Sequence, residues 1–309
     1  MSSFTLRAMK ADEWDEVAGL VRDSTNHWYE SHARPPIFTG DPEATRLFCE
    51  VYEALDPGRC LVAVNDSGRI AGSCFYRQRE THVALGIMNV HQDFFGQGIA
   101  RQLLVHITDF ADSLGLPTRL VSSAINLDSF SLYTRAGFVP GTAFQDMYVA
   151  DISRVPGADE LAGSDLLRPA TIEDAPAMAD LEKELVGIRR EEDHRFFIDN
   201  AQGIWHVLVS TDETGAINGF LSSVHHPGSH MLGPGVMRDE SVAAALIAAQ
   251  LRQYESSTPV FLVPCDAGNL VATLYSWGAR NCELHFAQVR GDSQRPTGIV
   301  MPSFMPETG

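Results

Sequence analysis

Cysteine is scarce in this 309-residue chain, and its few copies follow no regular spacing. The cysteines stand at positions 49, 60, 74, 265 and 282, and no C-x-x-C pair occurs among them. An odd number of scattered cysteines argues against a disulfide framework and against a zinc cluster. We therefore expect buried free thiols and no bound metal.

Long apolar segments are also missing. No run of 18 apolar residues occurs, which argues against a membrane-spanning helix. The N-terminal stretch MSSFTLRAMKADEW lacks the apolar core of a secretory leader. The sequence therefore predicts a cytoplasmic protein without membrane contacts.

Basic residues are also few. The chain has 23 Lys and Arg against 40 Asp and Glu, a formal net charge of -17. Such a surface repels a nucleic-acid backbone, so we expect no nucleic-acid partner. It is compatible with a cationic substrate such as an amine.

Two similar stretches indicate an internal repeat. LRAMKADEWDEVAGL begins at Leu6, and LRPATIEDAPAMADL begins at Leu167. In each, Leu-Arg resembles a first strand, and an acidic pair then falls in the first turn of a helix, where the helix dipole favours negative charge. Residues 151–165 contain Gly, Pro and Asp with little periodicity, which is typical of a linker. We predict one domain over residues 1–150 and a second over 166–309.

Each domain mixes helices with strands. In the first, helices are expected at 11–24, 42–55, 99–114 and 127–137, and strands at 81–90, 118–125 and 144–150, after a strand pair within 60–76. In the second, helices are expected at 172–185, 241–254 and 270–277, and strands within 203–226 and at 260–264. Pro35 and Pro36 break any helix in the aromatic-rich stretch from residue 25 to 40. This order predicts an α+β fold.

The stretch HQDFFGQGIARQLL, His91 to Leu104, carries two glycines just before an expected helix. Gly96 and Gly98 permit unusual backbone angles, and with the small Ala100 they leave room for an anion near the first N–H groups of the helix. The same pattern also suits a simple tight turn. It is neither a Walker A loop nor a dinucleotide fingerprint, because the lysine of the first and the third glycine of the second are absent.

A second motif follows the next expected strand. NLDSFSLYTRAGF places Asn126 and Ser129 at the start of a short helix, Tyr133 near its end and Gly137 at its C-cap. Asn126 suits either a ligand amide or the cap of the helix. A tyrosine hydroxyl at position 133 suits proton donation to a thiolate leaving group.

With these two motifs in this order and spacing, residues 4–150 resemble the GCN5-related N-acetyltransferase (GNAT) superfamily. FGQGIA, from Phe95 to Ala100, is similar to the family's [QR]-x-x-G-x-[GA] loop, except that Phe95 replaces Gln or Arg. Asn126 to Phe138 matches the family's N-x-x-[SA]-x-x-x-Y-x-x-x-G-F pattern. The resemblance implies a mixed, mostly antiparallel sheet with flanking helices, and the repeat implies that this fold occurs twice in tandem.

The resemblance also implies an acetyl-coenzyme A (acetyl-CoA) site and acetyl transfer to an amine of a small molecule or peptide. Pantetheine would follow the strand before the loop, and the pyrophosphate would meet the backbone N–H groups of the loop. Tyr133 would be the general acid, near Asn126 and Ser129 at the acyl end. The implied cosubstrate-binding residues are Met88, Asn89, Val90, Phe95, Gly96, Gln97, Gly98, Ile99, Ala100, Arg101, Asn126 and Ser129.

The general base and the acceptor pocket rest on weaker signals. Glu80 and His82 alternate at the start of the strand entering the cleft, so both could act as base on one face, or they form a structural polar pair. Trp28, Tyr29 and His32, in NHWYESH, either line the acceptor pocket or only pack against one another.

The second domain keeps the order of elements but has no evident phosphate loop. Asp239 and Glu240 stand at its comparable helix start, where they would repel a pyrophosphate. We expect a degenerate copy that packs against the first domain. The cluster HHPGSH, from His225 to His230, lacks a carboxylate or cysteine that would complete a metal site. The alternative to an enzyme is a non-catalytic CoA-binding sensor or scaffold.

Overall fold

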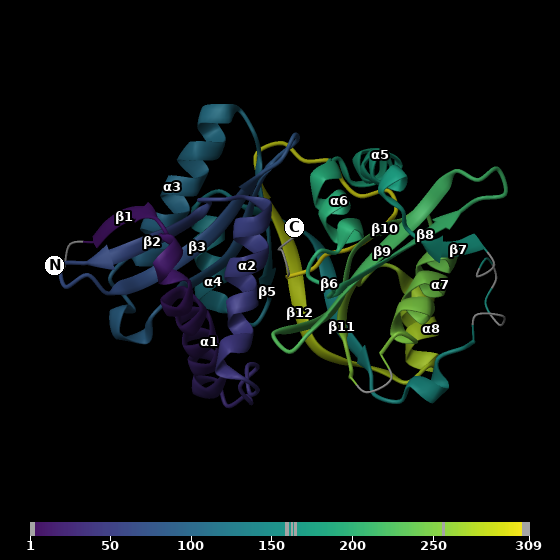
Figure 1. Cartoon of the computed structure of the whole chain (residues 1–309), viewed down its shortest axis with the longest axis horizontal. Coiled ribbons are helices and arrows are strands. Elements are labelled where there is room, and N and C mark those ends of the chain that lie inside the picture. The colour runs from purple at the N-terminus through teal and green to yellow at the C-terminus, as the bar shows by residue number, and fades with distance from the viewer. Residues whose placement is uncertain (1–3, 158–160, 162, 164–165, 255–256, 305–309) are drawn as a thin grey trace.

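The computed structural model describes residues 4–157, 161, 163, 166–254 and 257–304 (Figure 1). The helices of the first half are α1 (Trp14–Ser31), α2 (Arg46–Leu55), α3 (Ile99–Leu114) and α4 (Leu127–Arg135). Its strands are β1 (Phe4–Ala8), β2 (Cys60–Asn65), β3 (Ile70–Gln78), β4 (Val83–Val90), β5 (Thr118–Ser123) and β6 (Val139–Val149). The expected linker, residues 151–165, lies partly outside the described residues.

The second half repeats this order. Its helices are α5 (Ala175–Val186), α6 (Glu191–Asp199), α7 (Glu240–Leu251) and α8 (Gly268–Ser276). Its strands are β7 (Leu167–Pro169), β8 (Trp205–Thr211), β9 (Ile217–His226), β10 (Ser229–Met237), β11 (Val260–Pro264), β12 (Ala279–Arg290) and β13 (Ile299–Met301). Helix α6 and strands β10, β12 and β13 were not expected from the sequence.

Helix α1 is longer than its pattern suggested, and it includes most of the aromatic-rich stretch. It ends at Ser31 rather than at Ser24, because Pro35 and Pro36 come only after its C-cap at His32. The Asn26 side chain then accepts hydrogen bonds from the backbone N–H groups of Ile37 and Phe38. The following segment is thereby folded back along the helix.

One mixed sheet runs through both halves. Its order is β1-β2-β3-β4-β5-β12-β6-β11-β10-β9-β8-β7, with β13 paired to β10. Only the pairs β4–β5 and β10–β11 are parallel, so among the described strands the sheet is mostly antiparallel, as predicted. Strand β12 of the second half lies between β5 and β6 of the first, and β6 lies between β12 and β11 (Figure 1). Each half therefore contributes a strand inside the sheet of the other.

The apolar core likewise combines residues of both halves. One apolar cluster contains residues of α1 and α2 together with residues of α5, α6 and the strands of both halves, including Val17, Val51, Leu181 and Phe197. A second cluster lies under α3 in the first half, and a third lies under α7 and α8 in the second. Burial of this shared apolar surface stabilises the two halves together.

The two parallel strand pairs differ in one respect that matters for a ligand. Strands β4 and β5 pair only at Val83 with Thr118 and at Ala84 with Arg119, and beyond these residues the strands separate. Strands β10 and β11 also pair at only two positions. There, however, β13 pairs with β10 over Gly235 to Met237. The opening of the first half is free of any described strand, whereas that of the second half holds β13.

Candidate active site

A cavity of about 730 Å³ lies where β4 and β5 separate. Its walls come from α1, β4, the loop before α3, and the segment that joins β5 to α4. The predicted residues that line it are Trp28, Tyr29, Met88, Asn89, Val90, Phe95, Gly96, Gly98, Ile99, Ala100, Arg101, Asn126 and Ser129. Those that line it without having been predicted are Ser24, Thr25, Ile87, Phe94, Ser123, Asp128 and Leu132.

The glycine loop forms one end of the cavity. Gly96 and Gly98 have φ values of 75° and 79°, the left-handed region that favours glycine. Gly98 is the N-cap of α3, and no described side chain caps this helix start. The first N–H groups of α3 therefore remain available to an anion at the positive end of the helix dipole. The Gln97 side chain does not line the cavity but donates back to the Asp93 carbonyl at 3.5 Å.

Phe95, which departs from the loop pattern, lines the cavity and is about half exposed. The ring lies 6.0 Å from the ring of His27 on α1. The residue thus joins the loop to α1 by an aromatic contact. An anion held by backbone N–H groups needs no side chain at this position.

The opposite end of the cavity is lined by α1. Trp28 and Tyr29 line it, and His32 stands behind Trp28, with the two rings stacked 4.2 Å apart. The Asn89 amide on β4 donates to Ser24 Oγ at 2.7 Å, which fixes β4 against α1. Two of the three expected acceptor residues therefore face the cavity, and the third supports one of them.

Helix α4 brings the second motif to the same cavity. Asn126 caps it by accepting a hydrogen bond from the Ser129 N–H at 3.0 Å. Tyr133 is buried, packs against Phe138 and belongs to the apolar cluster under α3. It does not line the cavity. It lies four residues after Ser129, so the two side chains share a face of α4.

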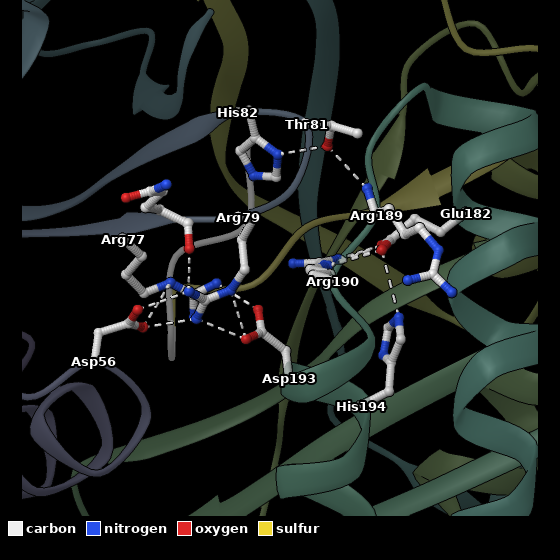
Figure 2. Close-up of polar contacts among 11 residues, drawn as sticks. Asp56, Arg77, Arg79, Thr81, His82, Glu182, Arg189, Arg190, Asp193 and His194 are labelled. Atoms are coloured by element: carbon white, nitrogen blue, oxygen red, sulfur yellow. Dashed lines mark hydrogen bonds and ion pairs between the residues drawn. The ribbon is translucent and has the colours of Figure 1, made fainter. Parts of the chain in front are cut away.

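His82 lies near the interface with the second half (Figure 2), Glu80 pairs with residues of that half, and neither lines the cavity. Glu80 is exposed and pairs with Lys183 at 3.0 Å and with Arg189 at 3.3 Å. His82 is 2% exposed and contacts Thr81, and burial together with nearby arginines lowers its pKa well below the usual value. A base for a reaction in the cavity is therefore not supplied by this pair in the described conformation.

The same interface holds a buried network that joins β3 to α6 (Figure 2). Arg77 and Arg79 both pair with Asp193, at 2.6 and 2.7 Å, and Arg79 also pairs with Asp56 at 2.6 Å. Nearby, Arg190 pairs with Glu182 at 2.6 Å inside the second half. The two pairs with Asp193 hold the β3–β4 end of the first half against the second half.

One carboxylate near the cavity was missed in the sequence. Glu283 of β12 accepts a hydrogen bond from Tyr29 Oη at 2.7 Å and another from Ser123 Oγ. Both donors line the cavity. No local signal in the sequence indicates this contact, because it depends on the insertion of β12 beside β5.

Each half of the chain matches a known protein family. Residues 25–138 match the acetyltransferase (GNAT) family, and residues 178–296 match an acetyltransferase (GNAT) domain. The chain belongs to the GNAT acetyltransferase family. It contains two GNAT domains in tandem, as the repeat predicted.

Solved structures share the tandem GNAT arrangement. A protein from Pyrococcus horikoshii has a TM-score of 0.74 at 14% identity, with 98% of this chain and 96% of that one covered. A GCN5-related N-acetyltransferase from Sphaerobacter thermophilus has a TM-score of 0.61 at 16% identity, covering 95% and 96%. A tandem GNAT protein from the clavulanic acid biosynthesis pathway has a TM-score of 0.59 at 16% identity, covering 94% and 100%. These likenesses show the fold. No curated protein sequence matches the chain.

The second GNAT domain has its own cavity of about 810 Å³ beside the start of α7. Asp239, Glu240 and Asp266 line it, with Arg238 as the basic residue among its lining side chains. Glu240 also accepts a hydrogen bond from the Leu270 N–H of α8. These three carboxylates line a cavity next to an opening filled by β13, and two of them stand at the start of α7, so they oppose the binding of a pyrophosphate.

Two further features concern metals and membranes. Within the part of the chain that the structure describes, no group of three or more His, Cys, Asp or Glu side chains is arranged to hold a metal ion. Over the same residues, every helix is too short or too polar to cross a lipid bilayer.

Proposed function

We propose that the first GNAT domain binds acetyl-CoA in the cavity at β4 and transfers the acetyl group to an amine. The observation that carries the proposal is the continuity of the opening between β4 and β5 with the glycine loop at α3. A long substrate with an anionic end fits such a path. The cavity volume also falls within the range of small-molecule sites, about 300–1,000 Å³.

The residues of the cavity fall into two groups, one for the pyrophosphate end of acetyl-CoA and one for its acyl end. The N–H groups from Gly98 to Arg101 would hold the pyrophosphate, and the Met88–Val90 backbone would pair with the pantetheine amides. Asn126 and Ser129 lie where the strands separate, near the acyl end. The acceptor amine would enter beside Trp28 and Tyr29, which both line the cavity and whose aromatic rings suit a cation.

The reaction is a direct transfer. The neutral amine nitrogen forms a bond to the thioester carbonyl carbon, the C–S bond breaks, and CoA leaves as a thiolate that takes up a proton. Tyr133 is our proposed donor of that proton, because it follows Ser129 on the same face of α4. Its burial keeps its hydroxyl away from bulk water.

The test combines binding with turnover. Calorimetry on the full chain measures the Kd for acetyl-CoA, and thiol release measures turnover with a panel of primary amines, polyamines and peptides. We expect binding, and thiol release that depends on an added amine. Binding without thiol release for any amine would overturn the enzyme and favour the CoA-binding sensor or scaffold. Absence of binding would overturn both.

A further inference from the structure

The strand β12 carries the carboxylate of Glu283 from the second GNAT domain to the acceptor end of the first domain's cavity. We propose that Glu283 is the proton acceptor for the attacking amine, reached through the hydroxyl of Tyr29. This inference rests on the acetyl transfer proposed above. It gives the second domain, whose own opening is filled, a part in the reaction of the first.

The strand order puts Glu283 beside the site. Strand β12 pairs with β5 so that His285 lies opposite Ser123, the last residue of β5 and part of the cavity wall. On its other side, β12 pairs with β6 with a register shift between Asn281 and Glu283. Such a bulge bends a strand locally and redirects its side chains. Glu283 thereby reaches across β5 toward α1.

Both oxygens of Glu283 are engaged by hydroxyl groups of the cavity wall. Tyr29 donates to Oε2 and Ser123 donates to Oε1. A hydroxyl that donates its proton to a carboxylate turns its lone pairs toward its other neighbours. Tyr29 therefore presents an acceptor to the cavity, which suits an N–H of an ammonium group.

Glu283 differs from the other carboxylates near this cavity. Its side chain is 7% exposed, so water screens its charge little. Among the described residues that line the cavity, Asp128 is the one carboxylate, and it is exposed in the first turn of α4. A shielded carboxylate attracts a cationic amine more strongly than an exposed one does.

Groups on four elements face Glu283. Tyr29 comes from α1 and Ser123 from β5, and the charge of Arg34, just beyond α1, acts on Tyr29. His285 of β12 has Nε2 at 4.0 Å from Glu283 Oε1, and its Nδ1 lies 2.8 Å from Asp146 Oδ1 on β6. Burial raises the pKa of Asp146 and, together with Glu283, that of Tyr29, so Tyr29 stays a neutral donor. The His285–Asp146 pair holds the strand position next to Glu283.

In the proposed reaction, the first proton moves from the amine through Tyr29 to Glu283. The ammonium of the acceptor gives one proton to Tyr29 Oη while Tyr29 passes its own proton to Glu283, which later releases it to water. The free amine then forms the N–C bond, and the C–S bond breaks. The second proton of the amine leaves the amide nitrogen, and one proton is taken up by the CoA thiolate. The sum is amide, CoA thiol and one released proton.

The test uses the full chain with whichever amine gives the largest thiol release. The variants are Glu283→Gln, which keeps the shape but removes the charge, and Glu283→Asp, which keeps the charge. Leu284→Ala is the control, because it removes an exposed side chain next along the same strand. The readouts are kcat/KM between pH 6 and 10, and the acetyl-CoA Kd.

We expect Glu283→Gln to lower kcat/KM at pH 7 by about 100-fold, within the usual range for a general base. The loss shrinks as pH rises, because the amine then loses its proton to the solvent, with an unperturbed pKa near 10. The Kd stays unchanged, Glu283→Asp recovers part of the rate, and Leu284→Ala behaves as wild type. An equal loss at every pH, or no loss, would overturn the inference while leaving acetyl transfer standing. A wild-type chain that binds acetyl-CoA but acetylates no amine would overturn the proposed function instead.

Discussion

Arg77 of β3 donates to Asp193 of α6, with Nη2 2.6 Å from Oδ2, and both side chains are essentially inaccessible to water. Arg79 contacts the same carboxylate through its Nε at 2.8 Å. The two arginines belong to the first GNAT domain and the aspartate to the second. The ion pair therefore depends on the packing of the two domains.

Asp193→Asn leaves two arginines beside a group that has lost its charge. Removal of one partner of a buried ion pair costs about 3–5 kcal/mol, so we expect a loss of that size in the free energy of unfolding. Urea unfolding of the full chain at pH 7 measures it. Glu184→Gln is the control, because its ion pair with Arg238 is exposed on both sides and adds little. Equal effects of the two variants would contradict this assignment.

The same carboxylate makes stability depend on pH. Burial alone would raise the pKa of Asp193, but the charges of Arg77 and Arg79 dominate and lower it far below its usual value. Its contribution to stability is therefore complete above the unfolded pKa, about 3.9, and is lost as pH falls toward the folded pKa. We expect the urea midpoint to fall below pH 4 in the wild type, and to fall less steeply in Asp193→Asn.

Gly98 and Gly115 lie at opposite ends of α3 and share a left-handed backbone, with φ values of 79° and 66°. An added Cβ meets no atom within 4 Å at either position. Either alanine variant therefore costs about 1–2 kcal/mol through backbone strain alone. Of the two glycines, only Gly98 lines the cavity. We expect Gly98→Ala to raise the Kd for acetyl-CoA at least about tenfold, while Gly115→Ala leaves it unchanged in calorimetry.

Much of this site could be predicted because its signals are local. The glycines before α3 and the Asn126 cap of α4 depend on a few adjacent residues, so their geometry follows from the sequence around them. The same holds for the order of helices and strands in the first domain, whereas α6 and the strands β10, β12 and β13 of the second were not expected. The aromatic stretch on α1 was misassigned in part, because no breaker precedes Pro35 and the helix continues to Ser31.

The remaining features depend on distant pairings. Glu283 reaches Tyr29 only because β12 lies beside β5, and β13 occupies the second opening only through its pairing with β10. Strand periodicity shows which face a residue takes, but not which strand lies next to it. Simple length arguments could have excluded His82, since Met88 lies six residues further along an extended strand, about 20 Å away.

Tyr133→Phe tests the proposed proton donor. Loss of the hydroxyl removes a proton source for the thiolate, so we expect kcat to fall by about 10²-fold with the Kd for acetyl-CoA unchanged. Tyr76→Phe is the control, since Tyr76 is buried in the same apolar cluster and its hydroxyl contacts Arg59. Thiol release and calorimetry on both variants measure the two quantities. If both variants lose the same activity, Tyr133 has a packing role and no catalytic one.

The two openings of the sheet predict how many acetyl-CoA molecules one chain binds. The opening beside β4 is lined by the glycine loop, whereas β13 and three carboxylates occupy the corresponding region of the second domain. We expect calorimetry to give one site per chain. Gly98→Asp places a negative charge at the start of α3 and abolishes that binding. Ser241→Ala, in the first turn of α7, leaves it unchanged. A stoichiometry of two, or binding that survives Gly98→Asp, would mean that the second domain also takes the cosubstrate despite its acidic helix start.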